Sequence, residues 1–200
     1  VDLLWKSAIS ESSNSEEFVD IINEYIPADN DYRINLKKRC FSLFESDDTD
    51  SGDDKVMFAL KLLIKIWKSS TEDEPSEDFD FLLKNCKLTM NNAFTLLTLL
   101  STIAGNFSHP FTDEELELIK HQVIEIVSIN SMYVFNFIQK LMTIQKGHLF
   151  TPHLLFSLLD WMSKLPTVDS VTFKLIRSLY EMIHSMMHSK SHKKEKNSEK

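Results

Sequence analysis

Apolar residues in the second half of the chain recur at the three- and four-residue spacing of an α-helix. Between residues 113 and 128 they are Leu116, Ile119, Val123, Ile126 and Val127. This spacing places them on one face of a helix. The residues before it form a helix start, because Thr112 can cap the first turn and Glu115 can complete a capping box. The pattern therefore predicts a helix that begins at about Asp113.

Three more helices are predicted after it, and their starts have a rhythm. They begin near Ser131, Pro152 and Ser170, and Thr151-Pro152 supplies a cap followed by proline at the first helical position. Alternate starts lie about 39 residues apart, close to the period of roughly 40–47 residues in HEAT and armadillo repeats. In helix length and spacing, residues 113–188 resemble an α-solenoid of this kind, although no repeat-specific motif is present. An irregular helical bundle is the alternative.

The first half of the chain is helical but less regular. Helices are expected over residues 31–45, 55–68, 80–86 and 91–104, and another after a capping box at Asn14–Glu17, which ends before Pro27; the opening stretch 1–9 is also counted as helical. With the four later helices, this predicts an all-α protein of about nine helices stacked as antiparallel hairpins. Residues 46–54 and 71–78 are rich in acids and poor in apolar side chains, so we expect mobile loops there.

These patterns predict one helical domain over residues 1–188. Residues 1–110 form its less regular part and residues 111–188 its regular hairpins. The basic segment 189–200 is expected to be a disordered tail. The chain opens on valine, and we expect it to be part of a longer protein.

The segment 55–68 is apolar almost all round, and its one polar stripe is Lys61, Lys65 and Lys68. Such a helix must be buried on most sides. Its surplus of apolar surface makes Phe58 and Trp67, together with the three lysines, candidate contacts for a partner. The alternative is a central core helix. We expect four side chains to be largely buried: Trp67, Leu97, Leu100 and Val123.

Composition narrows the functional classes. The chain has only 3 glycines, 2 cysteines and a formal net charge of −8. Phosphate-cradling loops need glycine, and no nucleophile or metalloprotease motif is present, so we expect neither enzyme activity nor a cofactor. No stretch is long and apolar enough to suggest a membrane span. Cys40 and Cys86 sit among apolar neighbours, which fits free thiols in a reducing, intracellular compartment.

One histidine pair deserves a test as a metal site. His184 and His188 are four residues apart in a predicted helix and could share a Zn²⁺ ion. Polar and cationic side chains are also favoured near a helix C-terminus by the helix dipole. Because no cysteine or carboxylate lies at a useful spacing nearby, we expect no metal here.

Four serines have an acidic residue three places on: Ser13, Ser51, Ser69 and Ser70. This spacing resembles the sites of acid-directed kinases. Phosphate there would add charge to acidic loops and create a patch that binds arginine or lysine. We treat the four as candidate phosphosites.

The remaining function is binding. We expect a non-catalytic scaffold that contacts other protein subunits, with no membrane association. The overall sequence pattern of the chain is similar to that of helical-repeat segments in large nuclear scaffolds such as chromosome-maintenance regulators. This similarity favours the nucleus over the cytoplasm. The alternative is a nucleic-acid adaptor that uses the basic tail and a cluster of four cations: Arg33, Lys37, Lys38 and Arg39.

Overall fold

The computed structural model describes residues 19–20, 30–45, 52–69, 75–86, 89–129, 131–144, 149–164 and 170–195. Within these ranges all regular structure is helical, and the eight helices α3 to α10 are close to the nine expected. The predicted helix over 1–9 lies outside them, and of the helix predicted after Asn14–Glu17 only residues 19–20 are described, as helical. The chain divides into two compact units, Val1–Asn106 and Phe107–Lys200. That division falls four residues before the predicted 110/111 border; a single domain over 1–188 stays a prediction.

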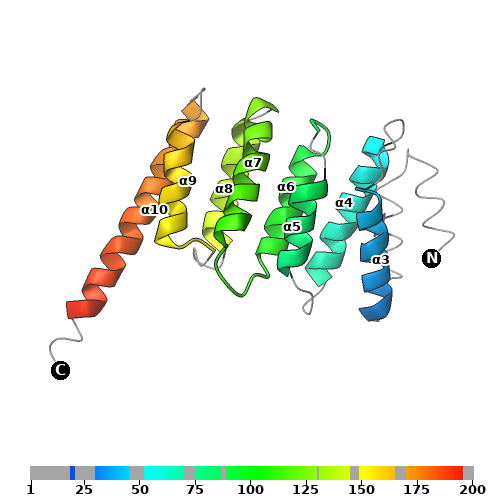
Figure 1. Ribbon diagram of the computed structural model, residues 1–200, viewed down its shortest axis with the longest axis horizontal. Coiled ribbons are helices and arrows are strands. Elements are labelled where there is room, and N and C mark those ends of the chain that lie inside the picture. Colours follow the sequence, from blue (N-terminus) through cyan, green and yellow to red (C-terminus); the bar gives the residue numbers. More distant parts are fainter. Residues whose placement is uncertain are drawn as a thin grey trace. The chain divides into compact units, whose positions relative to one another are not determined.

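Unit 1 contains two helical hairpins (Figure 1). The first is α3 (Asn30–Ser42) with α4 (Gly52–Ser69), and the second is α5 (Pro75–Asn85) with α6 (Ala93–Ala104). Helix α3 packs on α4, α5 packs on α6, and α4 packs on α6, so the hairpins are stacked. The predicted burial of Trp67, Leu97 and Leu100 is confirmed. The largest fully buried side chains in this unit include Phe58, Leu62, Leu63, Ile66, Phe79, Leu82 and Leu96.

Two helices of unit 1 begin earlier than predicted. Helix α4 begins at Gly52 rather than Lys55, with two aspartates in its first turn. Helix α5 begins at Pro75 rather than Asp80. Proline at the first helical position needs no N–H, and acids in the first turn interact favourably with the helix dipole. Four of the acidic residues that suggested loops therefore lie in helix starts, namely Asp53, Asp54, Glu77 and Asp78, while residues 46–51 and 71–74 lie outside the described ranges.

Unit 2 confirms all four predicted helix starts. Its helices are α7 (Asp113–Ile129), α8 (Ser131–Thr143), α9 (Pro152–Ser163) and α10 (Ser170–Glu195). Helix α7 packs on α8 and α9 packs on α10, while α7 also packs on α9 and α8 on α10. Each hairpin thus contributes one helix to each of two layers. This packing is consistent with a helical repeat or a bundle, and the name solenoid stays a prediction.

Caps explain why the starts could be predicted. The backbone N–H of Thr112 donates to Glu115 Oε2 at 2.7 Å, and the N–H of Glu115 donates to Thr112 Oγ1 at 3.1 Å. This is the expected capping box. The Thr151 side chain caps α9 by accepting from the N–H of Leu154. The side chain of Val123, predicted to be buried, lies outside the described side chains.

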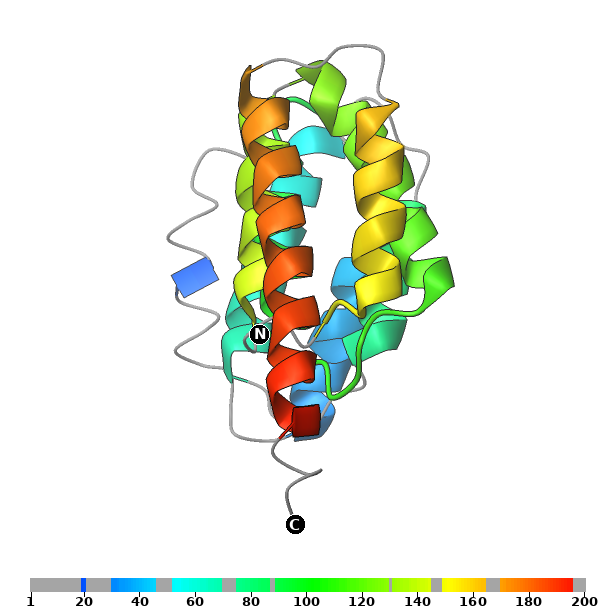
Figure 2. The same cartoon turned by 90° about the vertical axis from the view of Figure 1, so that its left-hand side faces the viewer.

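The predicted tail boundary at residue 188 is corrected, because α10 continues to Glu195. Lysine and glutamate are good helix formers, and lysines near a helix C-terminus interact favourably with its dipole. Helix α10 has 26 residues and its neighbour α9 has 12. At about 1.5 Å per residue, α10 is roughly 20 Å longer than α9. Figure 2 shows α10 beside α9 and extending past its end.

Candidate interaction surfaces

The apolar contact candidates of α4 are core residues. Phe58 is 1% exposed and Trp67 is 2% exposed. Because α4 packs against both α3 and α6, its apolar faces are covered inside unit 1. The alternative of a central core helix therefore describes α4, and neither Phe58 nor Trp67 is carried forward as a contact residue.

The lysines of α4 differ in exposure along the predicted stripe. Lys68 is exposed, whereas Lys61 and Lys65 are half-buried. Lys65 Nζ lies 3.2 Å from Asp20 Oδ1. None of the three is buried, so the predicted helix register holds, but two of them are partly covered within unit 1.

Two of the four cations proposed to bind nucleic acid are used inside unit 1. Lys37 Nζ lies 2.9 Å from Asp78 Oδ2 and 5.4 Å from the centre of the Trp67 ring. Arg33 Nη1 donates to the backbone carbonyl of Ser69 at 2.9 Å. These contacts join α3 to α4 and α5. Of the cluster, only Lys38 and Arg39 have exposed side chains.

The cysteines are unsuited to nucleophilic chemistry. Both thiols are free and buried. Burial raises the pKa of Cys86 from 9.0 to about 12 and raises the pKa of Cys40 further, because the apolar surroundings disfavour the thiolate. Since the thiolate is the reactive form, these are packing residues.

The predicted histidine pair is only half described. His184 is exposed on α10, and the side chain of His188 lies outside the described side chains. Among the described residues no group of three or more histidines, cysteines or acids could hold a metal ion. A search of the same residues finds no helix able to cross a membrane.

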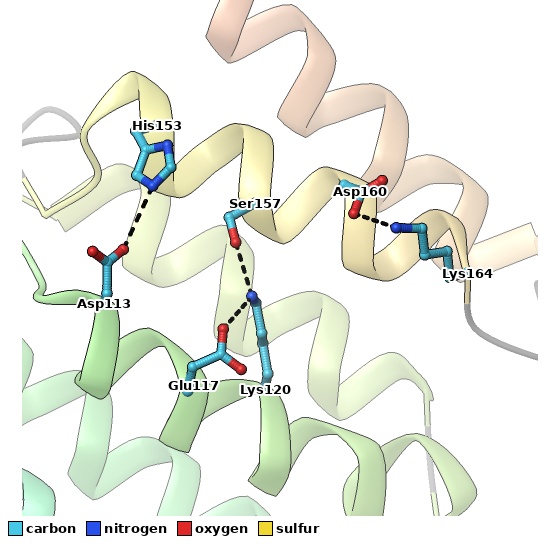
Figure 3. A network of polar contacts seen from close by, with 7 residues as sticks. All are labelled: Asp113, Glu117, Lys120, His153, Ser157, Asp160 and Lys164. Carbon is cyan, nitrogen blue, oxygen red and sulfur yellow. Dashed lines mark hydrogen bonds and ion pairs between the residues drawn. The ribbon is translucent and has the colours of Figure 1, made fainter.

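Unit 2 holds one polar cluster that the sequence did not suggest (Figure 3). Lys120 of α7 has a side chain only 8% exposed, and its Nζ donates to Glu117 Oε1 at 2.7 Å and to Ser157 Oγ of α9 at 2.9 Å. A lysine beside a serine hydroxyl is also the pair found in Ser–Lys hydrolases. Here the Nζ contacts the Glu117 carboxylate as well as the Ser157 hydroxyl, and it thereby joins two helices. The geometry therefore suits a clamp between α7 and α9.

The other ion pairs in Figure 3 lie on the surface. His153 Nε2 of α9 is 3.7 Å from Asp113 Oδ1 of α7, and both side chains are exposed. Lys164 Nζ lies 2.6 Å from Asp160 Oδ2 at the end of α9, also in solvent. Exposed pairs of this kind contribute about 0–1 kcal/mol each. They accompany the Lys120 clamp without forming a site.

Of the four candidate phosphosites, Ser69 is the one that lies among the described residues. Ser69 is exposed at the end of α4, and its Oγ donates to the backbone carbonyls of Lys65 and Ile66. Ser13, Ser51 and Ser70 lie outside the described residues. Their modification stays a prediction.

Large apolar side chains on the surface were missed by the sequence reasoning. Among the described residues, seven are exposed: Met90, Phe94, Met132, Phe156, Phe173, Tyr180 and Met187. The last three lie on α10 and are spaced seven residues apart. That spacing is visible in the sequence, but it lay beside the stronger core stripe of the same helix.

Comparisons with protein-family models, with curated proteins and with solved structures give no match to this chain.

Proposed function

We propose that the chain is a non-catalytic scaffold whose helix faces bind other proteins. The observation that carries this proposal is the grouping of exposed apolar side chains on helices. Single exposed apolar residues are ordinary on protein surfaces. Several on one face are informative, because the centres of protein interfaces are enriched in aromatic residues and methionine.

Two such groups are described. In unit 1, Met90 lies in the turn before α6 and Phe94 in the first turn of α6, and both are exposed. In unit 2, three large apolar residues are exposed along α10. A helical scaffold that binds through its outer faces has this distribution, with a closed core in each unit and apolar side chains outside it.

The proposal is tested by affinity purification of the tagged full chain and two variants, Phe94→Asp and Tyr180→Asp. Each places one negative charge in one apolar group. We expect each variant to lose a set of co-purifying proteins that the unaltered chain retains, measured by quantitative mass spectrometry. The control is Gln139→Asp, which adds the same charge at an exposed polar position of α8. Equal protein sets for all four chains would contradict the proposal.

The nuclear location is part of this proposal and is read from a fluorescent fusion of the full chain. Nucleic-acid binding is the competing function, and the engagement of Arg33 and Lys37 inside unit 1 weakens it. Because phosphate contacts strengthen as salt falls, a titration of DNA and RNA at low salt decides it. Tight binding that weakens steeply with added salt would favour the adaptor.

A further inference from the structure

Helix α10 carries a second apolar stripe on its outer face. Phe173, Tyr180 and Met187 are 63%, 61% and 59% exposed. Seven residues are nearly two turns of an α-helix, so the three side chains lie in one line along it. At about 1.5 Å per residue, the line is roughly 21 Å long.

This stripe lies beside the core stripe of the same helix. Leu175, Leu179 and Ile183 are buried, and α10 packs against α8 and α9. The apolar surface of α10 is therefore wider than the part that unit 2 covers. An outer line of three large side chains has no role in the core of the unit.

Polar side chains fill the gaps in the outer line. Arg177 and His184 are exposed and extend the series to positions 173, 177, 180, 184 and 187. This alternation of four and three residues is the spacing with which one helix lies along another. Two of the five positions carry nitrogen donors, and the Arg177 guanidinium has five N–H donors, one of which binds Glu181 at 2.9 Å.

The charge of α10 opposes that of the chain. Its sequence contains five lysines and arginines and two glutamates, a formal net charge of +3, whereas the whole chain carries −8. Lys174 stands exposed next to Phe173. A partner for this line must present apolar side chains to Phe173, Tyr180 and Met187, and carboxylates between them.

We infer that the outer face of α10, defined by Phe173, Arg177, Tyr180, His184 and Met187, binds an acidic amphipathic helix of another protein. This rests on the proposed scaffold function and gives it a partner chemistry. Helices of this type place apolar anchors at i, i+3 or i+4, and i+7 along a complementary surface. Their carboxylates would accept hydrogen bonds from Arg177 in the strong, charge-assisted geometry.

A second copy of α10 fits this face less well. An antiparallel pair centred on Tyr180 would bring together two helices that each have a formal net charge of +3, so their charges would repel. A parallel pair would align like charges along the whole helix. Both arrangements lack the negative charge that would offset this repulsion.

An anionic lipid surface also fits less well. Helices that lie in a membrane interface bury a broad apolar face, with cations around it. The broad apolar face of α10 is the one covered by α8 and α9. What remains outside is a narrow line interrupted by Arg177 and His184, which suits a second helix.

The test is a display selection against the full chain. The library consists of 21-residue helical peptides with leucines at heptad spacing, in which every other position is randomised equally between glutamate and lysine. General attraction to a chain of charge −8 would enrich lysine. We expect enrichment of glutamate at the positions flanking the leucines. The individual peptides should bind Tyr180→Asp at least about tenfold more weakly, as expected for loss of a central aromatic anchor.

Two variants control this selection. Gln139→Asp introduces the same charge at an exposed polar residue of α8, and it should leave peptide affinity within about twofold, a change of well under 1 kcal/mol. Arg177→Glu keeps the apolar line and should shift the selected peptides from glutamate toward lysine. Circular dichroism of each variant confirms that the helices are retained.

Lysine-rich winners, peptides that bind Tyr180→Asp as tightly, or no enrichment over Tyr180→Asp would each overturn the inference. Two further results would overturn the inference if no acidic peptide is selected. The first is dimerisation of the chain, seen by sedimentation, that Tyr180→Asp abolishes. The second is binding to phosphatidylserine vesicles that Tyr180→Asp abolishes. The scaffold proposal has a separate readout. If Phe94→Asp loses co-purifying proteins while this selection fails, the scaffold stands and only the assignment of α10 falls.

Discussion

Helices α4 and α10 are both rich in apolar residues, yet they use them differently. Helix α4 is apolar nearly all round, and its Phe58 and Trp67 are buried between α3 and α6. Helix α10 has an ordinary core stripe and a second line of apolar side chains that solvent reaches. The helix whose sequence is more apolar is thus the one with less apolar surface exposed.

The difference shows what apolar content measures. A helix between two neighbours needs two apolar faces, so a surplus of apolar residues reports the number of packing partners. An interaction face is marked instead by large apolar residues that lie off the core stripe and recur on their own line. On α10 these residues are Phe173, Tyr180 and Met187.

The largest effect should come from truncating the core of α4. Phe58→Ala removes a fully buried ring and leaves a cavity, which costs about 3–5 kcal/mol of unfolding free energy. Phe173→Ala on α10 removes the same ring from solvent and should change stability by no more than about 0.5 kcal/mol. Urea titrations of both variants measure the difference. Similar losses would erase the contrast between the two helices.

The next effect compares the stability contributed by a buried ion pair of unit 1 with that of an exposed ion pair on the surface of unit 2. Asp78→Ala leaves the Lys37 ammonium without its carboxylate in a site where both side chains are at most 13% exposed. Loss of one partner from a buried pair costs about 3–5 kcal/mol, reduced here toward the lower end by the remaining exposure. Glu181→Ala breaks the exposed pair with Arg177 and should cost about 0.2–1 kcal/mol. Equal values by urea titration would show that Lys37 is solvated.

Alkaline pH should destabilise unit 1 through its two buried thiols. In the unfolded chain a thiol ionises near its ordinary pKa of 9.0, whereas the folded pKa is about 12 for Cys86 and higher for Cys40. Above pH 9 the unfolded state binds fewer protons, so the unfolding free energy falls as pH rises. The slope approaches about 1.4 kcal/mol per pH unit for each thiol.

Unfolding titrations between pH 8 and pH 10.5 check this slope, with Cys86→Ala as the comparison chain. The variant should start less stable but lose stability more slowly with pH. Parallel pH profiles for the two chains would contradict the burial of Cys86. Unit 2 contains no cysteine, so its local stability should lack this dependence.

The smallest effect is at the start of α7. Thr112→Ala removes the side chain that accepts from the N–H of Glu115, and it should cost about 1 kcal/mol. Thr112→Ser keeps the acceptor and should restore most of that loss. Hydrogen exchange of the α7 amides in the full chain measures this loss. Equal protection of α7 in Thr112→Ala and Thr112→Ser would mean that the cap contributes nothing.

Much of the fold was predictable because its signals are local. The starts at Asp113, Ser131, Pro152 and Ser170 follow from caps, proline positions and helical spacing, and all four are confirmed. The starts at Gly52 and Pro75 were misplaced, because acidic residues favour both loops and first turns of helices. The end of α10 was also misplaced, since a lysine-rich sequence suits either a tail or a last turn.

The candidate surfaces were less predictable because they depend on which faces are covered. Sequence showed that Phe58 and Trp67 are apolar, but the packing of α3 and α6 decides their burial. Lys120 and Ser157 are 37 residues apart and meet only because α7 packs on α9. The outer line of α10 has regular spacing, yet its exposure depends on where α8 and α9 lie.

The most direct test of the central claim is hydroxyl-radical footprinting of the full chain, alone and with a selected glutamate-rich helical peptide, read by mass spectrometry. In the free chain, Phe173, Tyr180 and Met187 should be labelled and Phe58 should be protected. The peptide should protect the three residues of α10 and leave Phe94 labelled. Protection of the α10 residues in the free chain, or unchanged labelling with peptide bound, would contradict the account.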